Sequence, residues 1–314
     1  MEQTLKIKRK RKSFKQFMSR EYSKILFLLA FVIPAFVLYF WTHWVPAFDS
    51  ITGSFDKWNG FGDPKFVGFN NYLSIIQDPV FWKAVKNSLL FVLGKEILIV
   101  PTVILFAVSL TKMRLKKAEM LFYRYVFYIP NIISISIIGI LWTFIFNPAN
   151  GLLNSILSGI GLESWIPETG WLVDYTMPSV IVVASWCGIG YFMIILISAI
   201  NSIPISLYEA ADIDGAGQWR QLWNVTMPTV WEHVRFMIIQ ILVGGIGSYE
   251  IVMLMLGGAG VDNSGITMGY YAYFYGLDSP HPAVGYSYAA SVLILILTST
   301  ITLICNRIVA ERRD

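Results

Sequence analysis

Three carboxylates within six residues form the polar cluster best suited to chemistry in this chain. Glu209, Asp212 and Asp214 belong to the stretch "LYEAADIDGAGQWRQLWNVTMP", which has a long apolar run on each side. Such a cluster can contact a cationic surface of a protein partner, and Asp212-Ile213-Asp214 is also an Asp-x-Asp pattern that could hold a metal ion and a nucleotide sugar. The small side chains of Ala210 and Ala211 leave a shallow face on which a partner could sit.

A second set of ionisable residues lies within apolar segments. Lys95 and Glu96 fall in one run and Glu250 in another, at depths of roughly 13 and 9 Å from the outer ends if each residue rises about 1.5 Å. Charged groups inside a membrane are costly and are candidates for function. Two interpretations remain open: a structural Lys95–Glu250 ion pair that holds two helices together, and side chains that line a path for a substrate.

The cysteines and histidines do not form a metal-binding pattern. Cys187 and Cys305 lie in apolar runs, where they are interpreted as small buried side chains. His43, His233 and His281 are isolated from one another and from any carboxylate cluster. We therefore predict no metal site.

The elements that position these residues are membrane helices. The 314 residues are 55% hydrophobic and only 14% charged, whereas soluble domains have about a quarter charged residues. Each of six apolar runs is near the roughly 20 residues needed to cross a bilayer. We predict an all-α membrane protein with one six-helix domain at 25–308 between tails at 1–24 and 309–314; the spans are expected at Ile25–Phe48, Asn87–Leu110, Tyr125–Asn147 (kinked at Pro130), Tyr175–Tyr208, Phe236–Leu256 and Pro282–Asn306.

Positive charge predicts the orientation. Of the 24 Lys and Arg residues, nine lie in residues 1–24, whereas Lys57, Lys65, Lys83 and Lys86 are the four on the opposite side. Because cytoplasmic loops collect Lys and Arg, both termini and the acidic stretch are expected in the cytoplasm. The basic N-terminus is interpreted as a tail near anionic lipid, not as a cleaved signal or a nucleic-acid site.

The acidic stretch itself predicts a helix-turn-helix over residues 201–230. Pro204 suits a first helical turn, Gly215 can bend the chain, and "QWRQLWNVTMP" is typical of a second helix that ends at Pro228. A loop lying on the membrane surface is the alternative. Surface helices that bind anionic lipid are usually rich in Lys and Arg, so the three acids favour a protein partner.

The spacing in this stretch resembles the EAA loop of bacterial ABC importer permeases. Glu209-Ala210-Ala211, Gly215 and Val225-Thr226-Met227-Pro228 match the pattern Glu-Ala-Ala, three residues, Gly, nine residues, Ile, one residue, Leu-Pro, with Val225 and Met227 in place of Ile and Leu. The segments "FVGFNNYLSIIQDPVFWKAVKNSLLF", "PANGLLNSIL" and "GGAG" also resemble the sugar and oligosaccharide branch of that family.

The resemblance implies a type I ABC importer permease fold in a bacterial cell membrane. Its implied partners are a second permease subunit, expected to be a different chain, two cytoplasmic ATP-binding subunits and an extracytoplasmic solute-binding protein. Glu209, Ala210, Ala211, Asp212 and Gly215 would contact the ATPase, as the coupling helix of the family does. No Gly-x4-Gly-Lys-Ser/Thr pattern occurs in the sequence, so ATP and Mg²⁺ are expected in the partner, with no cofactor and no enzyme activity in this chain.

A sugar substrate adds candidates to the path. Aromatic faces and hydrogen-bonding groups bind sugars, and therefore Asn131, Trp186 and Tyr249 join Lys95 and Glu250 as candidate path residues. Two other classes of function are alternatives. A secondary transporter would have inverted repeats and paired broken helices, and a membrane glycosyltransferase would use Asp212 and Asp214 to bind a metal.

Overall fold

The computed structural model describes residues 14–112 and 116–310. The chain forms two compact units, Met1–Thr52 and Gly53–Asp314. In the first unit, helix α1 (Phe14–Tyr39) continues through the π-helical turn η1 (Phe40–Trp44) into α2 (Val45–Gly53). The helix thus begins inside the segment predicted as a tail, and the other predicted tail residues, 1–13 and 311–314, lie outside the described residues.

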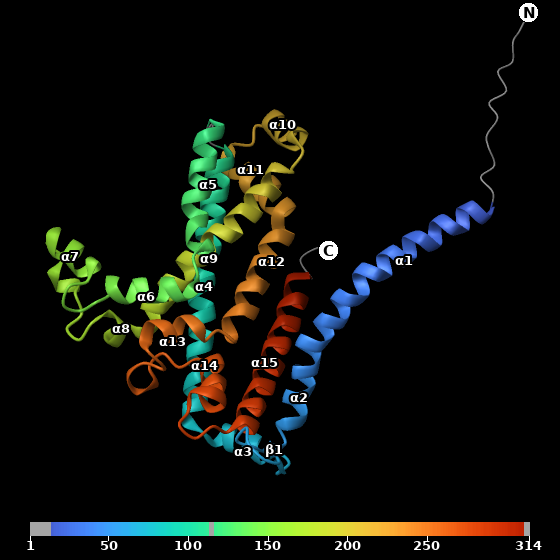
Figure 1. Cartoon of the computed structure of the whole chain (residues 1–314). Coiled ribbons are helices and arrows are strands. Elements are labelled where there is room, and N and C mark those ends of the chain that lie inside the picture. Colours follow the sequence, from blue (N-terminus) through green and yellow to red (C-terminus); the bar gives the residue numbers. More distant parts are fainter. Residues whose placement is uncertain (1–13, 113–115, 311–314) are drawn as a thin grey trace, which may run out of the picture. The chain divides into compact units, whose positions relative to one another are not determined.

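The second unit is almost entirely helical, with one two-stranded antiparallel hairpin in which Asp56 pairs with Phe66 (Figure 1). Its first elements are β1 (Asp56–Lys57), β2 (Lys65–Phe66), α3 (Asn70–Gln77), α4 (Pro79–Lys112), α5 (Lys117–Ile132), α6 (Ile135–Ile145), α7 (Leu152–Gly159), η2 (Glu163–Trp165), α8 (Trp171–Asp174) and α9 (Thr176–Asn201). The remaining elements are α10 (Ile205–Ile213), α11 (Gln218–Gln221), η3 (Leu222–Thr226), α12 (Met227–Ile246), α13 (Glu250–Leu256), η4 (Val261–Asn263), α14 (Met268–Tyr273), η5 (Phe274–Asp278) and α15 (Val284–Ala310).

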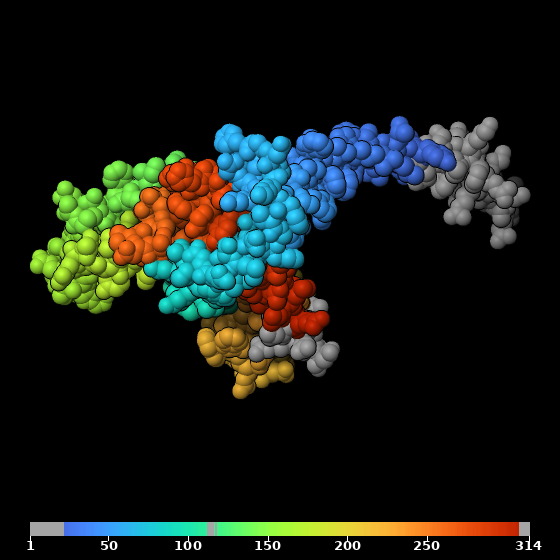
Figure 2. All heavy atoms as spheres, turned by 90° about the horizontal axis from the view of Figure 1, so that it is seen from below, coloured from blue at the N-terminus to red at the C-terminus, as the bar shows by residue number. Residues whose placement is uncertain are grey.

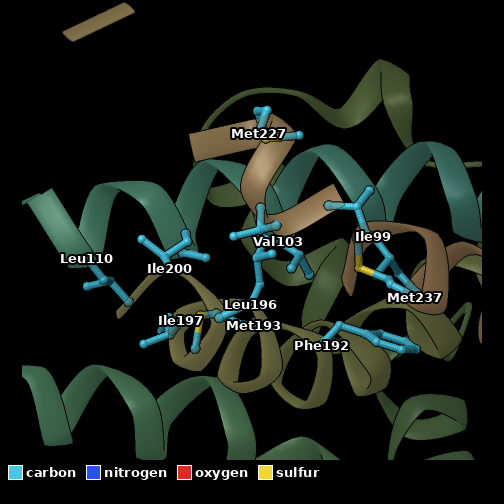
Figure 3. Packing of buried hydrophobic residues seen from close by; sticks show 14 of the residues in the cluster. Ile99, Val103, Leu110, Phe192, Met193, Leu196, Ile197, Ile200, Met227 and Met237 are labelled. Carbon is cyan, nitrogen blue, oxygen red and sulfur yellow. The ribbon is translucent and has the colours of Figure 1, made fainter. Parts of the chain in front are cut away.

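Helices α4, α9 and α12 pack around a buried apolar core. Figure 3 shows Ile99 and Val103 of α4 facing Met193 and Leu196 of α9, with Met237 of α12 beside them. Glycines allow the closest approaches of the helices, because no Cβ separates the backbones. A Cβ at Gly190 of α9 would overlap the backbone carbonyl of Phe127 in α5.

Among the described residues, five continuous helical segments are long and apolar enough to cross a membrane: Tyr22–Gly53, Pro79–Thr111, Thr176–Asn201, Gln218–Ile246 and Val284–Arg307. The pair α5 and α6, whose axes differ by 96°, would make a sixth crossing if the two helices form one span. The predicted single span at Tyr125–Asn147 is therefore wrong in its geometry. The helix does not merely kink at Pro130; it ends at Ile132, since Ile133 and Ser134 are extended.

The predicted span at Phe236–Leu256 is also divided. The helix that contains α12 ends at Ile246, and the short helix α13 begins at Glu250. Gly244, Gly245 and Gly247 lie at this break, and glycine lowers helix stability by about 1 kcal/mol relative to alanine. Packing compensates for this loss of helix stability, because α13 lies against α6, where Leu254 covers Gly139.

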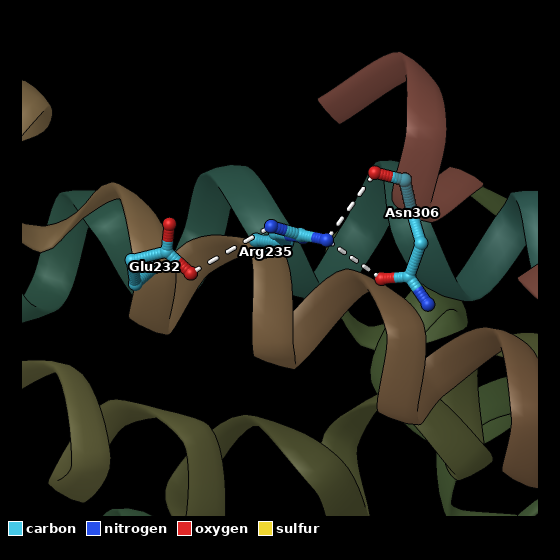
Figure 4. Close-up of polar contacts among 3 residues, drawn as sticks. All are labelled: Glu232, Arg235 and Asn306. Atoms are coloured by element: carbon cyan, nitrogen blue, oxygen red, sulfur yellow. Dashed lines mark hydrogen bonds and ion pairs between the residues drawn. The ribbon is translucent and has the colours of Figure 1, made fainter. Parts of the chain in front are cut away.

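A polar contact joins α12 to α15 near the end of the chain. The guanidinium of Arg235 donates hydrogen bonds to the side chain and the backbone carbonyl of Asn306, at 2.9 and 3.2 Å (Figure 4). The carboxylate of Glu232 lies 3.8 Å from the same guanidinium. Arg235 therefore links the helix that follows the acidic loop to the last helix.

The hairpin and α3 lie at the end of the unit away from α10, with α14 near them, and the segments that follow α6 and α13 lie at one side of the unit (Figure 1). The latter two segments lie side by side (Figure 2) and are joined where the hydroxyl of Thr176 donates to that of Ser264 at 3.1 Å. The hydroxyl of Tyr271 donates to the carboxylate of Asp78 at 2.7 Å. Burial raises the pKa of Tyr271 well above its usual range, so that this donor stays protonated.

Candidate functional site

The acidic stretch forms an exposed helix followed by a tight turn. Helix α10 starts directly after Pro204 and ends at Ile213, as the sequence predicts. The turn passes through Gly215 at φ +70°, a conformation that other L-residues rarely adopt. Glu209 and Ala210 are exposed on α10, and Ala211 is half-buried.

Hydrogen bonds fix α10 to the helix that follows it. The side-chain amide of Gln221 donates to the carboxylate of Asp212 and, at 3.0 Å, to the carbonyl of Ala216. The hydroxyls of Tyr208 and Thr226 share a hydrogen bond of 2.9 Å. Asp212 therefore has a structural contact, whereas Glu209 projects from the loop.

The second helix of the predicted helix-turn-helix does not end at Pro228. Instead the helix runs without interruption from Gln218 to Ile246, through the π-helical turn η3. Proline lacks an N–H and its ring crowds the carbonyl four residues earlier, and the wider π-helical turn directly before Pro228 accommodates both effects. As a result, α10 connects through one short turn to a helix long enough to cross a membrane.

The surface of this loop combines charge with exposed apolar side chains. Ile213 at the end of α10 is 87% exposed, and Trp219 and Trp223 expose more than half of their surface. Between α10 and the following helix lies a hollow of about 300 Å³ that Ala210, Ala211 and Asp214 help to line. Such a mixed surface, with a shallow hollow, is typical of a protein interface.

Of the two open interpretations of Lys95 and Glu250, the ion pair is not formed among the described residues. Lys95 is half-buried, and its ammonium lies 5.2 Å from the centre of the Phe91 ring. It stands on the part of α4 that packs on α9, where a Cβ at Gly94 would meet Ile181. Glu250 is exposed at the start of α13, beyond the break that divides the predicted span Phe236–Leu256.

Two other candidate path residues meet near the middle of α9. The side-chain amide of Asn131 donates to the backbone carbonyl of Cys187 at 3.4 Å, and Trp186 precedes Cys187. The Trp186 ring packs edge-on against Trp142 of α6, with 5.6 Å between the ring centres. Asn131 and Trp186 thus lie together where α5, α6 and α9 converge.

Tyr249 lies elsewhere, at the break between α12 and α13. Its ring stacks on Tyr273 with centres 4.9 Å apart, and both rings line a cavity of about 330 Å³ that also contacts α15. The candidate path residues therefore fall into two groups. Lys95, Asn131 and Trp186 lie around Cys187, and Tyr249 and Glu250 lie at the start of α13.

Sequence reasoning missed the residues that hold the loop over residues 201–230 and those that build a hollow between α6 and α9. Gln221 is buried and bridges two segments, yet in the sequence it is one glutamine of a polar run. A hollow of about 850 Å³ lies in the loop between α6 and α9, lined by Trp165, Trp171, Tyr175 and Asp174 among others. The sequence signal that could have indicated this hollow is the aromatic content of the loop between α6 and α9, which has no Lys or Arg.

The family model described as "Binding-protein-dependent transport system inner membrane component" matches residues 99–314. The chain belongs to this family and is a multi-pass membrane component of a transport system.

Similar proteins agree with this assignment. The chain is 32% identical over 277 residues to the probable ABC transporter permease protein YurN of Bacillus subtilis, covering 87% of this chain and 92% of the relative. It is 30% identical over 256 residues to the diacetylchitobiose uptake system permease protein NgcF of Streptomyces coelicolor, covering 79% and 72%. It is 27% identical over 245 residues to the arabinooligosaccharides transport system permease protein AraP of Bacillus subtilis, covering 77% and 76%.

The fold also has a solved counterpart. A chain of a bacterial ABC transporter involved in the import of the acidic polysaccharide alginate superposes with a TM-score of 0.77, covering 95% of this chain and 99% of that chain at 22% identity. The fold is therefore that of an ABC importer permease.

Proposed function

We propose that this chain is the permease subunit through which a bacterial ABC importer moves a sugar or oligosaccharide, and that residues 201–230 couple it to a cytoplasmic ATPase. The family supplies the transport role. A carbohydrate substrate is supported by relatives named for diacetylchitobiose and arabinooligosaccharides. The secondary transporter weighed above lacks support, because the family is binding-protein-dependent.

The observation that carries the coupling role is the connection between α10 and α12. The loop exposes Glu209 and Ile213 for contact, while Asp212, Gln221 and Thr226 fix it to a continuous helix ending at Ile246. A displacement of α10 by a partner would therefore move the helix Gln218–Ile246 as one rigid body. This helix ends at the break beside Tyr249, which is one of the candidate path residues.

The partners follow from this role. Two cytoplasmic ATP-binding subunits would bind ATP and Mg²⁺, and a second permease subunit would complete the path. An extracytoplasmic solute-binding protein would deliver the substrate. Support comes from a similar structure, a bacterial alginate ABC transporter in complex with an alginate pentasaccharide-bound periplasmic protein. Both termini of this chain would be cytoplasmic.

The test is a matched pair of glycine substitutions in the loop. Gly215 has φ +70°, whereas Gly217 has an ordinary φ of −64°, and neither has a neighbour within 4 Å of an added Cβ. Gly215→Pro demands a φ near −65° and also disfavours the backbone conformation of Asp214, φ −74° and ψ 2°, because proline favours an extended residue before it. We expect ATP-dependent sugar uptake by the whole complex in proteoliposomes to fall at least about tenfold, with membrane insertion unchanged.

Gly217→Ala is the control and should leave uptake unchanged. Gly215→Ala should be intermediate, because alanine in a left-handed conformation costs about 1–2 kcal/mol. Normal uptake by the Gly215→Pro variant would contradict the coupling role.

A further inference from the structure

We infer that the hollow in the loop between α6 and α9, here called the loop pocket, binds an uncharged saccharide. The loop pocket has a volume of about 850 Å³, within the range of about 300–1,000 Å³ for small-molecule sites. Residues that contribute to its chemistry are Phe146, Trp165, Glu168, Trp171, Asp174 and Tyr175. The inference rests on the proposed sugar transport and on the proposed orientation, in which this loop is extracytoplasmic.

Aromatic side chains provide fixed faces in the loop pocket. Trp171 donates its indole N–H to the side-chain oxygen of Asn154 at 2.7 Å, and Asn154 is itself buried and bonded to the backbone of Pro148. The rings of Phe146 and Tyr175 lie 6.3 and 5.9 Å from the Trp171 ring. Trp165 is 66% exposed on another wall. Rigid rings give contact area to the C–H faces of a sugar at little cost in side-chain entropy.

One carboxylate of the loop pocket is already oriented to accept hydrogen bonds. The backbone N–H and the hydroxyl of Thr169 both donate to Asp174, at 2.9 and 2.8 Å. These bonds lower the pKa of Asp174 below its ordinary value, so that it is ionised at neutral pH. A carboxylate has about four acceptor positions, and the backbone N–H of Gly170 also interacts with Asp174, which leaves at least one position for a hydroxyl of a ligand.

Gly170 permits the backbone conformation that connects Thr169 to Trp171. Gly170 lies between Thr169 and Trp171 with φ +117°, and a Cβ there would lie 3.2 Å from Pro148. The hydroxyl of Ser179 in α9 donates to the carbonyl of Trp171 at 3.1 Å. The ring of Trp171 and the carboxylate of Asp174 are therefore held by the fold in the absence of a ligand.

The charge of the loop selects among ligands. Residues 147–178 contain Glu163, Glu168 and Asp174 but no Lys or Arg. An anionic sugar or a lipid phosphate would be repelled, because such groups are usually bound by Lys and Arg. A neutral saccharide instead donates its hydroxyls to carboxylates and packs its C–H faces on aromatic rings.

The test is saccharide binding to the full chain in lipid nanodiscs, measured by saturation-transfer NMR. The probes are the neutral trisaccharides maltotriose, chitotriose and arabinotriose, with trigalacturonate as the acidic counterpart. We expect at least one neutral trisaccharide to bind. Trigalacturonate should bind at least about tenfold more weakly than that neutral trisaccharide. Trp165→Ala and Asp174→Asn should each weaken binding about tenfold, since a hydrogen bond to a charged group or a stacked ring is lost.

Trp82→Ala is the control, because Trp82 is an exposed tryptophan outside the loop pocket and its loss should not change the affinity. The inference is wrong if no neutral probe binds, or if trigalacturonate binds equally well. It is also wrong if Trp165→Ala removes co-purified phospholipid without changing saccharide affinity.

Uptake assays separate this inference from the proposed function. If the assembled importer transports a saccharide with the same half-saturating concentration after both loop-pocket substitutions, the loop-pocket site is wrong and the proposed function stands. If the importer transports no saccharide in any form, the proposed function itself has failed.

Discussion

At the residue scale, two acidic side chains of the same motif, Glu209 and Asp212, have different roles. Asp212 accepts a hydrogen bond from Gln221 and stabilises the turn, whereas Glu209, on the same helix, is exposed. Sequence spacing suggested a similar contact role for both residues. The difference depends on which side of α10 faces the following helix, and on a partner nine residues further along the chain.

Path residues were harder to predict than loop residues. Lys95 and Glu250 could be placed at similar depths only if both helices were continuous. The break at Gly247 removes Glu250 from α12, so the calculated depth does not apply to it. Asn131 and Trp186, which lie near one another, were chosen for their chemistry alone, and their role in transport stays a prediction.

The Thr169–Asp174 contact predicts a pH effect at the residue scale. Because hydrogen bonds from Thr169 lower the pKa of Asp174 below 3.8, the contact stabilises the turn above that value and is lost only as the pH falls through the lowered pKa. Thr169→Val removes the hydroxyl donor, and protonation of Asp174 should then occur at a higher pH. Hydrogen exchange of the Thr169 amide, corrected for its intrinsic pH dependence, measures the midpoint.

Thr169→Ser keeps a hydroxyl and serves as the control. Equal midpoints for Thr169→Val and the unsubstituted chain would show that the hydroxyl does not set the ionisation of Asp174.

At the element scale, apolar length predicted the helices well but not where they break. Pro130 was recognised as a disruption, yet α5 ends only at Ile132 and α6 turns by 96°. Single-sequence patterns cannot anticipate this, because the bend is stabilised by the packing of α6 on α13, far away in the chain. The loop over residues 201–230 was predicted more closely, since Pro204 and Gly215 are local signals.

Two glycines of α9 predict how tightly the helices pack. A Cβ at Gly190 would overlap the backbone of Phe127 in α5, whereas a Cβ at Gly188 would meet the flexible end of Ile99. Gly190→Ala should therefore destabilise the protein by about 1–3 kcal/mol, as overpacking does. Thermal unfolding in detergent, followed by circular dichroism, should show a lower midpoint.

Gly188→Ala is the matched control, because it adds the same methyl group to the same helix. If both variants unfold at the same temperature, the close contact between α5 and α9 does not limit stability.

At the scale of the whole molecule, the exposed apolar surface of the chain agrees with a subunit of a larger assembly. Besides the apolar membrane helices, the loop over residues 201–230 exposes Ile213, Trp219 and Trp223, and the family is binding-protein-dependent. In the proposed function, transport by this chain depends on partners at both membrane faces. The loop pocket, if it binds saccharide, would extend the path beyond the membrane helices.

The most direct test of the account is cross-linking from the tip of α10. A photoreactive benzoylphenylalanine at Ile213, which is 87% exposed, is compared with one at Phe61, which is 81% exposed in the loop between β1 and β2. Both variants are expressed in the native cell, irradiated, and purified for mass spectrometry. We predict that position 213 captures an ATP-binding subunit and that position 61 does not. Capture of lipid alone at position 213, in cells that still import the sugar, would contradict coupling through this loop.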